Sequence, residues 1–119
     1  MGFLRVRVSV SHPQERQRTG EAELLVDTGV TFTVLPAAVA QELALQPEAV
    51  RRLRTADGRA LERSQGLAYV EVDGHAATVP VIFGGEGDIP VLGVTTLEIL
   101  GLAFDPVKGE LHPSEYLYL

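Results

Sequence analysis

The chain has 119 residues, of which 45% are hydrophobic and 22% are charged, and its formal net charge at pH 7 is −6. This balance is typical of one compact globular domain, which we expect over residues 1–119. The acidic charge argues against a nucleic-acid surface, and the absence of cysteine excludes disulfides, thiolate catalysis and zinc sites of the thiolate type. A domain of this size buries a limited share of its surface, so a dimer interface would help to stabilise it.

The sequence indicates neither a membrane segment nor a metal site. No run approaches the ~18 apolar residues that a membrane helix needs, and the first residues lack the pattern of a signal segment, so we expect a cytoplasmic protein. His12, His75 and His112 lie far apart without the spacing of metal ligands, and we expect them in surface or hydrogen-bonded positions. We therefore predict no metal and no cofactor.

The first part of the chain has the pattern of short strands. Over residues 4–10, apolar side chains alternate with polar ones, which is the period-2 pattern of a strand with one solvent-facing side. A loop is expected over residues 11–20. A second strand over residues 21–26 and an extended segment over residues 32–35 are expected to follow.

A short helix and a series of hairpins are expected next. Pro36 predicts the start of a helix that runs to about Leu45, and Pro47 is expected to end it. From residue 50 to residue 83 the pattern returns to strands, punctuated by two dipeptides that favour hairpin turns. These turns are Asp57-Gly58 and Asp73-Gly74.

Two clusters in this region suggest no chemistry of their own. The arginines Arg51, Arg52 and Arg54 are interpreted as a solvated face. Gly84-Gly85-Glu86-Gly87 lacks the lysine and the helix of a phosphate-binding loop, so a flexible loop is expected there.

The triplet Asp27-Thr28-Gly29 carries the clearest chemical signal. It follows the apolar run Leu24-Leu25-Val26 and precedes Thr33-Val34-Leu35. A carboxylate at the end of a buried strand, with a glycine turn behind it, is held where backbone N–H groups and a second carboxylate can reach it. The alternative is an aspartate that caps an ordinary turn after a strand.

Two segments of the chain resemble the motifs of retropepsin-like (retroviral-type) aspartic proteases. Residues 26–35 resemble the first motif, and Val91-Leu92-Gly93, followed by residues 94–100, resembles the second. In that family the second segment passes behind the catalytic strand, and the short helix after it ends in a glycine like Gly101. The resemblance implies an all-β, small, closed, barrel-like acid-protease fold with one or two short helices, in a homodimer.

The resemblance also implies a catalytic role for the triplet. Since the chemistry needs two carboxylates that share a proton, and the sequence has one Asp-Thr-Gly, two copies of Asp27 would activate a water molecule for peptide-bond hydrolysis. Thr28 would bond across the dimer axis, and Gly29 would supply backbone freedom and an N–H near the carboxylates. A strand-end threonine and a generic turn glycine are the alternatives. The expected partners are a peptide or protein substrate and a second copy of the chain.

Substrate contacts are expected beside the triplet and at a hairpin that occupies the position of the family's flap. A plain surface hairpin is an equal alternative for the segment around Asp57-Gly58. Phe32, Val81 and Ile82 could also line subsites, although core packing is the usual role of such side chains. The residues predicted to bind substrate are Val30, Thr31, Ala56, Asp57, Gly58, Ile89 and Val91.

The chain departs from the family pattern at three positions. Val30 replaces the usual alanine or serine, and its branched side chain could crowd the substrate backbone. Thr31 and Val94 replace an acidic residue and an arginine that pair in retroviral members. These changes leave open a second function, in which the fold binds peptides or assembles without cutting them.

The last residues have the alternation of a strand. Tyr116-Leu117-Tyr118-Leu119 could join the interleaved terminal sheet through which subunits of the family dimerise. A frayed end or pairing within the same chain is the alternative.

Overall fold

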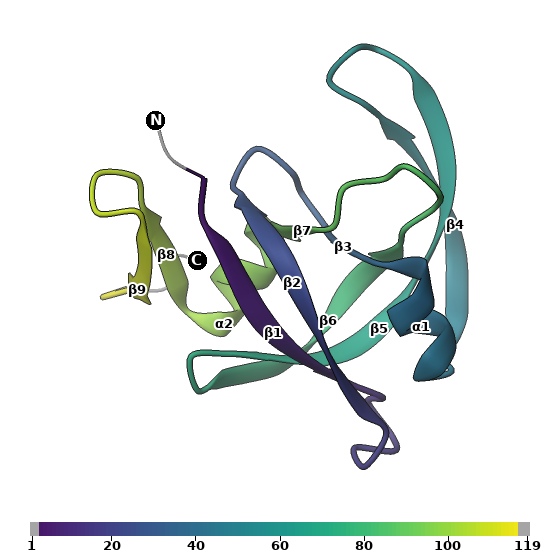
Figure 1. Cartoon of the computed structure of the whole chain (residues 1–119), viewed down its shortest axis with the longest axis horizontal. Helices are drawn as coiled ribbons and strands as arrows, with labels where there is room; N and C mark the ends of the chain where they lie inside the picture. The colour runs from purple at the N-terminus through teal and green to yellow at the C-terminus, as the bar shows by residue number, and fades with distance from the viewer. Residues whose placement is uncertain (1–2, 117–119) are drawn as a thin grey trace.

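The computed structural model describes residues 3–116, and Figure 1 shows a barrel of strands flanked by two short helices. This mostly β architecture confirms the expected fold class. In chain order the elements are β1 (Arg5–Ser11), β2 (Thr19–Asp27), β3 (Thr33–Leu35), α1 (Ala37–Glu42), β4 (Pro47–Arg54), β5 (Ala60–Val72), β6 (His75–Phe83), β7 (Val91–Gly93), α2 (Val94–Leu100), β8 (Leu102–Asp105) and β9 (Glu110–Pro113).

One sheet closes on itself to form the barrel. Its strand order is β1-β2-β7-β3-β6-β5-β4, and β1 also pairs with β5, so six strands form a closed ring that β4 extends at one edge. Most pairs are antiparallel, but β2 pairs with β7, and β3 with β6, in parallel. Strands β8 and β9 form a separate two-stranded sheet. The predicted closed barrel is therefore confirmed.

The alternation in the sequence places one side of each strand in the core. In β1, Val8 and Val10 are fully buried and Arg5 and Arg7 are exposed. Inward-facing side chains from β2, β3, β5, β6, β7, β8 and both helices complete a single apolar cluster. Burying side chains of this size contributes about 1.5 to 3 kcal/mol each before the entropy of ordering them is subtracted. Its fully buried aliphatic members include Leu24, Leu35, Val70, Val79, Val81 and Leu92.

The loop predicted over residues 11–20 is shorter than expected. Strand β1 includes Ser11 and β2 begins at Thr19, and these two residues pair directly. Their side-chain hydroxyls are also hydrogen-bonded at 3.0 Å. In the remaining turn, His12 accepts hydrogen bonds at Nδ1 from two backbone N–H groups. These cross-strand contacts lengthen both strands beyond the apolar pattern.

The first helix is also shorter than predicted. Pro36 is its N-cap, as the sequence suggested, but α1 ends at Glu42 and not near Leu45. Ala44 has a φ of 54°, which lies in the left-handed region and breaks the helix. Pro47 does more than end the helix, because it is the first residue of β4. The prediction erred here because burial of Leu45 in the core decides where the chain turns.

Both predicted turns and the glycine end of the second helix are present. Asp73 and Gly74 have φ angles of 51° and 82°, and they connect β5 to β6 in a tight hairpin. Gly58 has a φ of 89° in the loop between β4 and β5. Gly101 caps α2 with a φ of 73°.

The C-terminal strand predicted from Tyr116 onward lies outside the described residues except for Tyr116, whose side chain is exposed. In residues 3–116, no helix is long and apolar enough to cross a membrane.

Gly93 lies where two backbone segments come very close. A Cβ atom at this position would be 2.6 Å from the carbonyl carbon of Phe32 and 2.9 Å from the nitrogen of Thr33. Real Cβ atoms essentially never approach this closely, and backbone atoms cannot rotate away as a side chain can. The close approach predicted at this glycine is therefore observed, and it positions β7 behind the segment that follows Asp27.

We expect Gly93→Ala to lower the free energy of unfolding by about 1 to 3 kcal/mol, because the added methyl group forces the backbone of Phe32 to move. Urea denaturation measures this change. Gly20→Ala is the matched control, since a Cβ at Gly20 would meet only the side chain of Leu43, at 3.9 Å. Equal stability of the two variants would contradict the packing argument.

Candidate active site

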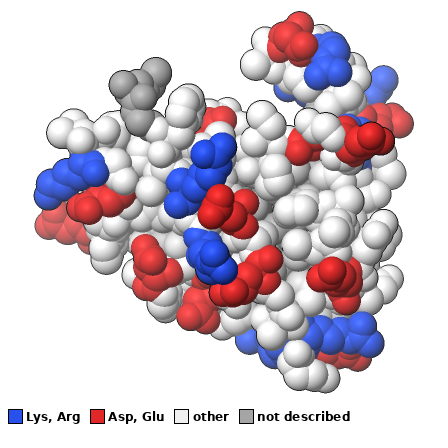
Figure 2. All heavy atoms as spheres, viewed as in Figure 1, with Lys and Arg blue, Asp and Glu red and all other residues white. Residues whose placement is uncertain are grey.

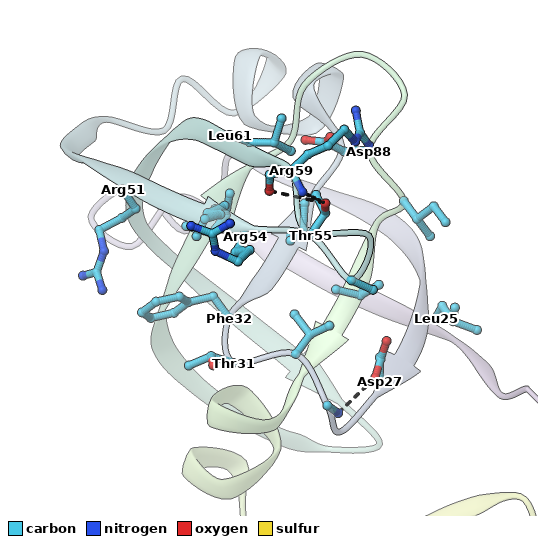
Figure 3. Close-up of a pocket in the computed structure, with 18 of the residues that line it drawn as sticks. Leu25, Asp27, Thr31, Phe32, Arg51, Arg54, Thr55, Arg59, Leu61 and Asp88 are labelled. Atoms are coloured by element: carbon cyan, nitrogen blue, oxygen red, sulfur yellow. Dashed lines mark hydrogen bonds between the residues drawn. The ribbon is translucent and has the colours of Figure 1, made fainter.

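Asp27 is the last residue of β2 and lies at the mouth of an open cleft (Figure 3). It pairs with Gly93 of β7, and the chain turns sharply after it, with the N–H of Val30 donating to the carbonyl of Asp27. The N–H of Gly29 donates to the Asp27 Oδ1 at 3.0 Å. The carboxylate is half-buried, so it is oriented by the backbone while it remains accessible from the cleft.

Gly29 supplies the N–H that was predicted near the carboxylate, but not the predicted backbone freedom. Its φ does not lie in the left-handed region, so the position does not require the conformational freedom of glycine. A Cβ there would instead lie 3.3 Å from the Asp27 Oδ1, which is tighter than most real contacts. The missing side chain therefore leaves room for the carboxylate that its N–H binds.

The loop that carries the triplet is fixed to the start of α2. The N–H groups of Val94 and Thr95 donate to the carbonyls of Val30 and Thr31 at 2.8 and 3.1 Å. Val94 and Thr31, which replace a charged pair of retroviral members, thus lie in adjacent segments that are joined by backbone hydrogen bonds.

A buried threonine pair supports this loop from behind. Thr33 and Thr96 are both fully buried, and their hydroxyl oxygens are 2.6 Å apart. The Thr33 hydroxyl also accepts the N–H of Gly93 at 3.0 Å. Every hydroxyl in this network therefore has a partner, as buried polar groups require. Sequence reasoning noted Thr33 but missed Thr96, whose only signal was a polar residue on the buried side of α2.

The cleft has a volume of about 920 Å³ and lies between the triplet loop, the β4–β5 hairpin and the segment before β7. Figure 3 shows Asp27 at one side and the hairpin residues Arg54 and Thr55 across from it. Its apolar lining comes from six strands and the loops between them, and includes Leu25, Val30, Phe32, Val34, Leu53, Leu61, Ile82, Ile89 and Val91. These walls can take up apolar side chains of an extended ligand.

Seven of the ten predicted site residues line this cleft. They are Asp27, Gly29, Val30, Thr31, Ala56, Ile89 and Val91. Thr28 is exposed but does not contribute to the lining of this single chain. Asp57 and Gly58 lie at the tip of the hairpin, also outside the lining. Of the possible subsite residues, Phe32 and Ile82 line the cleft, while Val81 belongs to the core.

The tip of the hairpin is held by its own side chains. The Thr55 hydroxyl donates to the carboxylate of Asp57, and the Arg59 Nε donates to the same carboxylate at 3.1 Å. The hydrogen bond from Thr55 is the main reason that the pKa of Asp57 is lowered. Asp57 therefore orders the hairpin tip, and Thr55, Ala56 and Arg59 face the cleft.

Sequence reasoning missed a second set of cleft residues on β4. Arg51, Arg52 and Arg54 are exposed, as predicted, but they also line the cleft. The Arg51 guanidinium lies 5.1 Å from the centre of the Phe32 ring. No local pattern relates β4 to Phe32, because the barrel alone brings them together.

A charged pair beside the cleft was also missed. Asp88 accepts two hydrogen bonds from Arg63 of β5, at 2.7 and 3.0 Å, and a third from the N–H of Gly85. The bonds from Arg63 are the main reason that the pKa of Asp88 is lowered. The glycine-rich loop therefore lies near the cleft but is pinned to β5, and a Cβ on Gly85 would come within 2.8 Å of the Arg63 Nε.

We expect Asp88→Asn to lower the free energy of unfolding at pH 7 by about 1 to 2 kcal/mol, because both side chains of the pair are only about one-fifth exposed. A lowered pKa means that the stabilisation is present above the ordinary value of 3.8 and is lost as the pH falls through the folded-state pKa. The difference between wild type and variant should therefore shrink below pH 3.8.

Urea denaturation at neutral and acid pH measures this dependence. Glu62→Gln removes an exposed carboxylate from the same strand as Arg63 and serves as the control. A stability difference that stays constant from pH 7 to about pH 2 would contradict the assignment of Asp88 as the titrating group.

The three histidines are hydrogen-bonded to backbone groups and do not line the cleft. His75 is hydrogen-bonded through Nδ1 to the carbonyl of Leu100, and His112 to that of Pro113. In the described part of the chain, no three histidine or carboxylate side chains are grouped as metal ligands would be.

Comparison with known proteins agrees with this geometry. The family model described as gag-polyprotein putative aspartyl protease matches residues 18–99, a range that contains the triplet, the hairpin and most of α2. No curated protein matches the chain.

Proposed function

Because the chain belongs to the retropepsin-like aspartyl protease family, we propose that it is a homodimeric aspartic endopeptidase with Asp27 as its catalytic residue. The observation that carries the proposal is the position of Asp27. Its carboxylate is half-buried at the end of a strand, bonded to the Gly29 N–H, and open to a cleft with apolar walls.

The need for a second carboxylate supports a dimer. Peptide hydrolysis by this chemistry uses two carboxyl groups that share one proton. Asp88 is the other carboxylate that lines the cleft, but Arg63 holds it in a bidentate pair. The remaining source is Asp27 of a second copy. Exposed Thr28 lies beside it and is available for a contact across the dimer axis.

The proposed reaction divides two tasks between the two copies of Asp27. The ionised carboxylate takes a proton from a water molecule as the water oxygen attacks the scissile carbonyl carbon, while the protonated carboxyl donates its proton to the carbonyl oxygen. The tetrahedral diol then collapses, a proton passes to the amide nitrogen, and the C–N bond breaks. The N–H of Gly29 orients the carboxylate that it contacts.

The hairpin supplies the second feature that a peptidase needs. Thr55, Ala56 and Arg59 line the cleft opposite the triplet, so the β4–β5 hairpin is positioned to act as a flap over an extended peptide. Closure of the hairpin would exclude bulk water from the two Asp27 carboxyl groups and would strengthen the electrostatic interactions between these groups and the substrate. Apolar walls on both sides of Asp27 favour substrates with apolar side chains next to the scissile bond.

We expect Asp27→Asn to abolish cleavage of a diverse peptide pool between about pH 3 and pH 7, because an amide cannot accept the proton of the attacking water. Mass spectrometry of the products measures the loss. Asp73→Asn is the matched control, since Asp73 lies in an exposed turn whose positive φ asparagine also tolerates. Cleavage that persists in a folded Asp27→Asn protein would contradict the proposal.

A specific observation also supports peptide binding without cleavage. The branched side chain of Val30 lines the cleft three residues after Asp27, at a position where the family usually has a smaller side chain.

We expect Val30→Ala to raise kcat/KM several-fold, on the order of the tenfold that 1.4 kcal/mol of relieved crowding would give. Peptide kinetics measure this change. A folded dimer that cleaves nothing, with or without Val30, would favour the binding function.

A further inference from the structure

The β4 side of the cleft carries positive charge without a carboxylate partner. Arg51, Arg52 and Arg54 all line the cleft, and among the described residues none of them has a carboxylate within 4.0 Å. The other two arginines of this region are paired, Arg59 with Asp57 and Arg63 with Asp88. This local excess of positive charge contrasts with the net charge of −6 of the whole chain.

Neutral contacts orient two of these arginines and leave their charge uncompensated. The Arg51 Nη1 donates to the Gln65 Oε1 at 3.1 Å, and its guanidinium lies over Phe32. The Arg54 Nη1 donates to the carbonyl of Gly58 at 2.9 Å. Each guanidinium keeps further N–H donors for a ligand. Arg52 differs, because it lies opposite Glu62 in the β4–β5 pairing.

The pictures place this charge away from the triplet. Figure 3 shows Arg51 and Arg54 on the hairpin side of the cleft and Asp27 on the other side. In Figure 2, basic and acidic side chains lie side by side in several places between larger uncharged areas, and the projecting hairpin carries both signs. The uncompensated arginines are therefore a feature of the cleft and not of a uniformly basic surface.

We propose that the cleft selects peptides that carry an acidic side chain at a subsite removed from the scissile bond, with Arg51 and Arg54 as the residues that recognise the carboxylate. This inference rests on the proposed endopeptidase function for its cleavage step, while the binding step stands independently. A guanidinium fork matches a carboxylate in bidentate geometry, and apolar walls beside it take up the rest of the peptide.

A peptide fits this cleft better than a nucleic acid does. Ten apolar side chains line it, and the Asp27 carboxylate, on the side away from the arginines, would repel a phosphate backbone. The acidic net charge of the chain adds to that repulsion. A peptide presents one carboxylate to the arginines and places neutral backbone near Asp27.

The proposal predicts a characteristic pH dependence. A glutamate side chain of the peptide is recognised in its ionised form, and its ordinary pKa is about 4.3. The preference for glutamate over glutamine should therefore be small near pH 3 and grow as the pH rises toward 6. Cleavage by the two Asp27 carboxyl groups is favoured by lower pH instead, because one of the two must stay protonated.

The test uses pairs of peptides that differ by glutamate or glutamine at one position, moved along the peptide. Binding to the Asp27→Asn protein is measured by fluorescence anisotropy at pH 6, and cleavage by wild type is measured in parallel. We expect the best glutamate peptide to bind about three- to tenfold more tightly than its glutamine partner. The preference should decline with added salt.

Substitutions test whether Arg51 and Arg54 cause the preference for glutamate. Arg51→Gln and Arg54→Gln should each reduce the glutamate preference, and Arg54→Lys should restore part of it, because it keeps the charge without the fork. Arg18→Gln is the control for net charge, since Arg18 lies in the turn between β1 and β2 and pairs with Glu15. It should leave the preference unchanged.

The outcomes separate this inference from the proposed function. Glutamate-selective binding that needs Arg51 and Arg54 supports the inference even if no peptide is cleaved, in which case only the peptidase proposal fails. Cleavage with equal preference for glutamate and glutamine overturns the inference and leaves the peptidase proposal in place. A single-stranded oligonucleotide that binds more tightly than the acidic peptide, through the same arginines, would also overturn it.

Discussion

The parallel pairing of β2 with β7 is the constraint on which the rest of the site depends. It places Asp27 opposite Gly93, and the absence of a side chain at Gly93 lets β7 press against the backbone of Phe32 and Thr33. The start of α2 follows directly, and it fixes the triplet loop by donating two backbone N–H groups to the carbonyls of that loop. The position of the carboxylate is therefore set by backbone contacts and close packing, which are stiffer than side-chain contacts.

The walls of the cleft depend on interactions of another kind. On one side, Arg63 and Asp88 tie the glycine-rich loop to β5, and on the other, Thr55, Asp57 and Arg59 order the tip of the hairpin. These contacts involve charged side chains near the surface, and they are weaker than the packing behind Asp27. The segments behind Asp27 are packed tightly, while the hairpin and the glycine-rich loop are held by weaker contacts. This arrangement suits a site that holds a carboxylate in place and admits an extended chain.

The position of Asp27 at the mouth of the cleft also bears on the dimer proposed above. A single Asp27 has a hydrogen-bonded N–H partner and access to solvent, but among residues 3–116 the other carboxylate that lines the cleft, Asp88, is bound to Arg63. In the dimer proposed above, a second copy would complete this site by symmetry. The arginines of β4 also line this cleft, and the role proposed for them concerns which peptides bind and not how a bond is broken.

Local patterns in the sequence determined much of this protein. The alternation of residues 4–10, the turn at Asp73-Gly74 and the glycines at positions 93 and 101 each reflect a requirement of one short backbone segment. The closed β barrel was implied by the resemblance of the segments around Asp27 and Gly93 to a known family. Only the tertiary structure could decide what meets across the barrel. It brought Arg51 of β4 to Phe32, Arg63 to Asp88 and Thr96 to Thr33, and it ended α1 early by burying Leu45. These contacts join residues that are 19 to 63 positions apart. Pairing over such separations is set by the closure of the sheet, which no local pattern encodes.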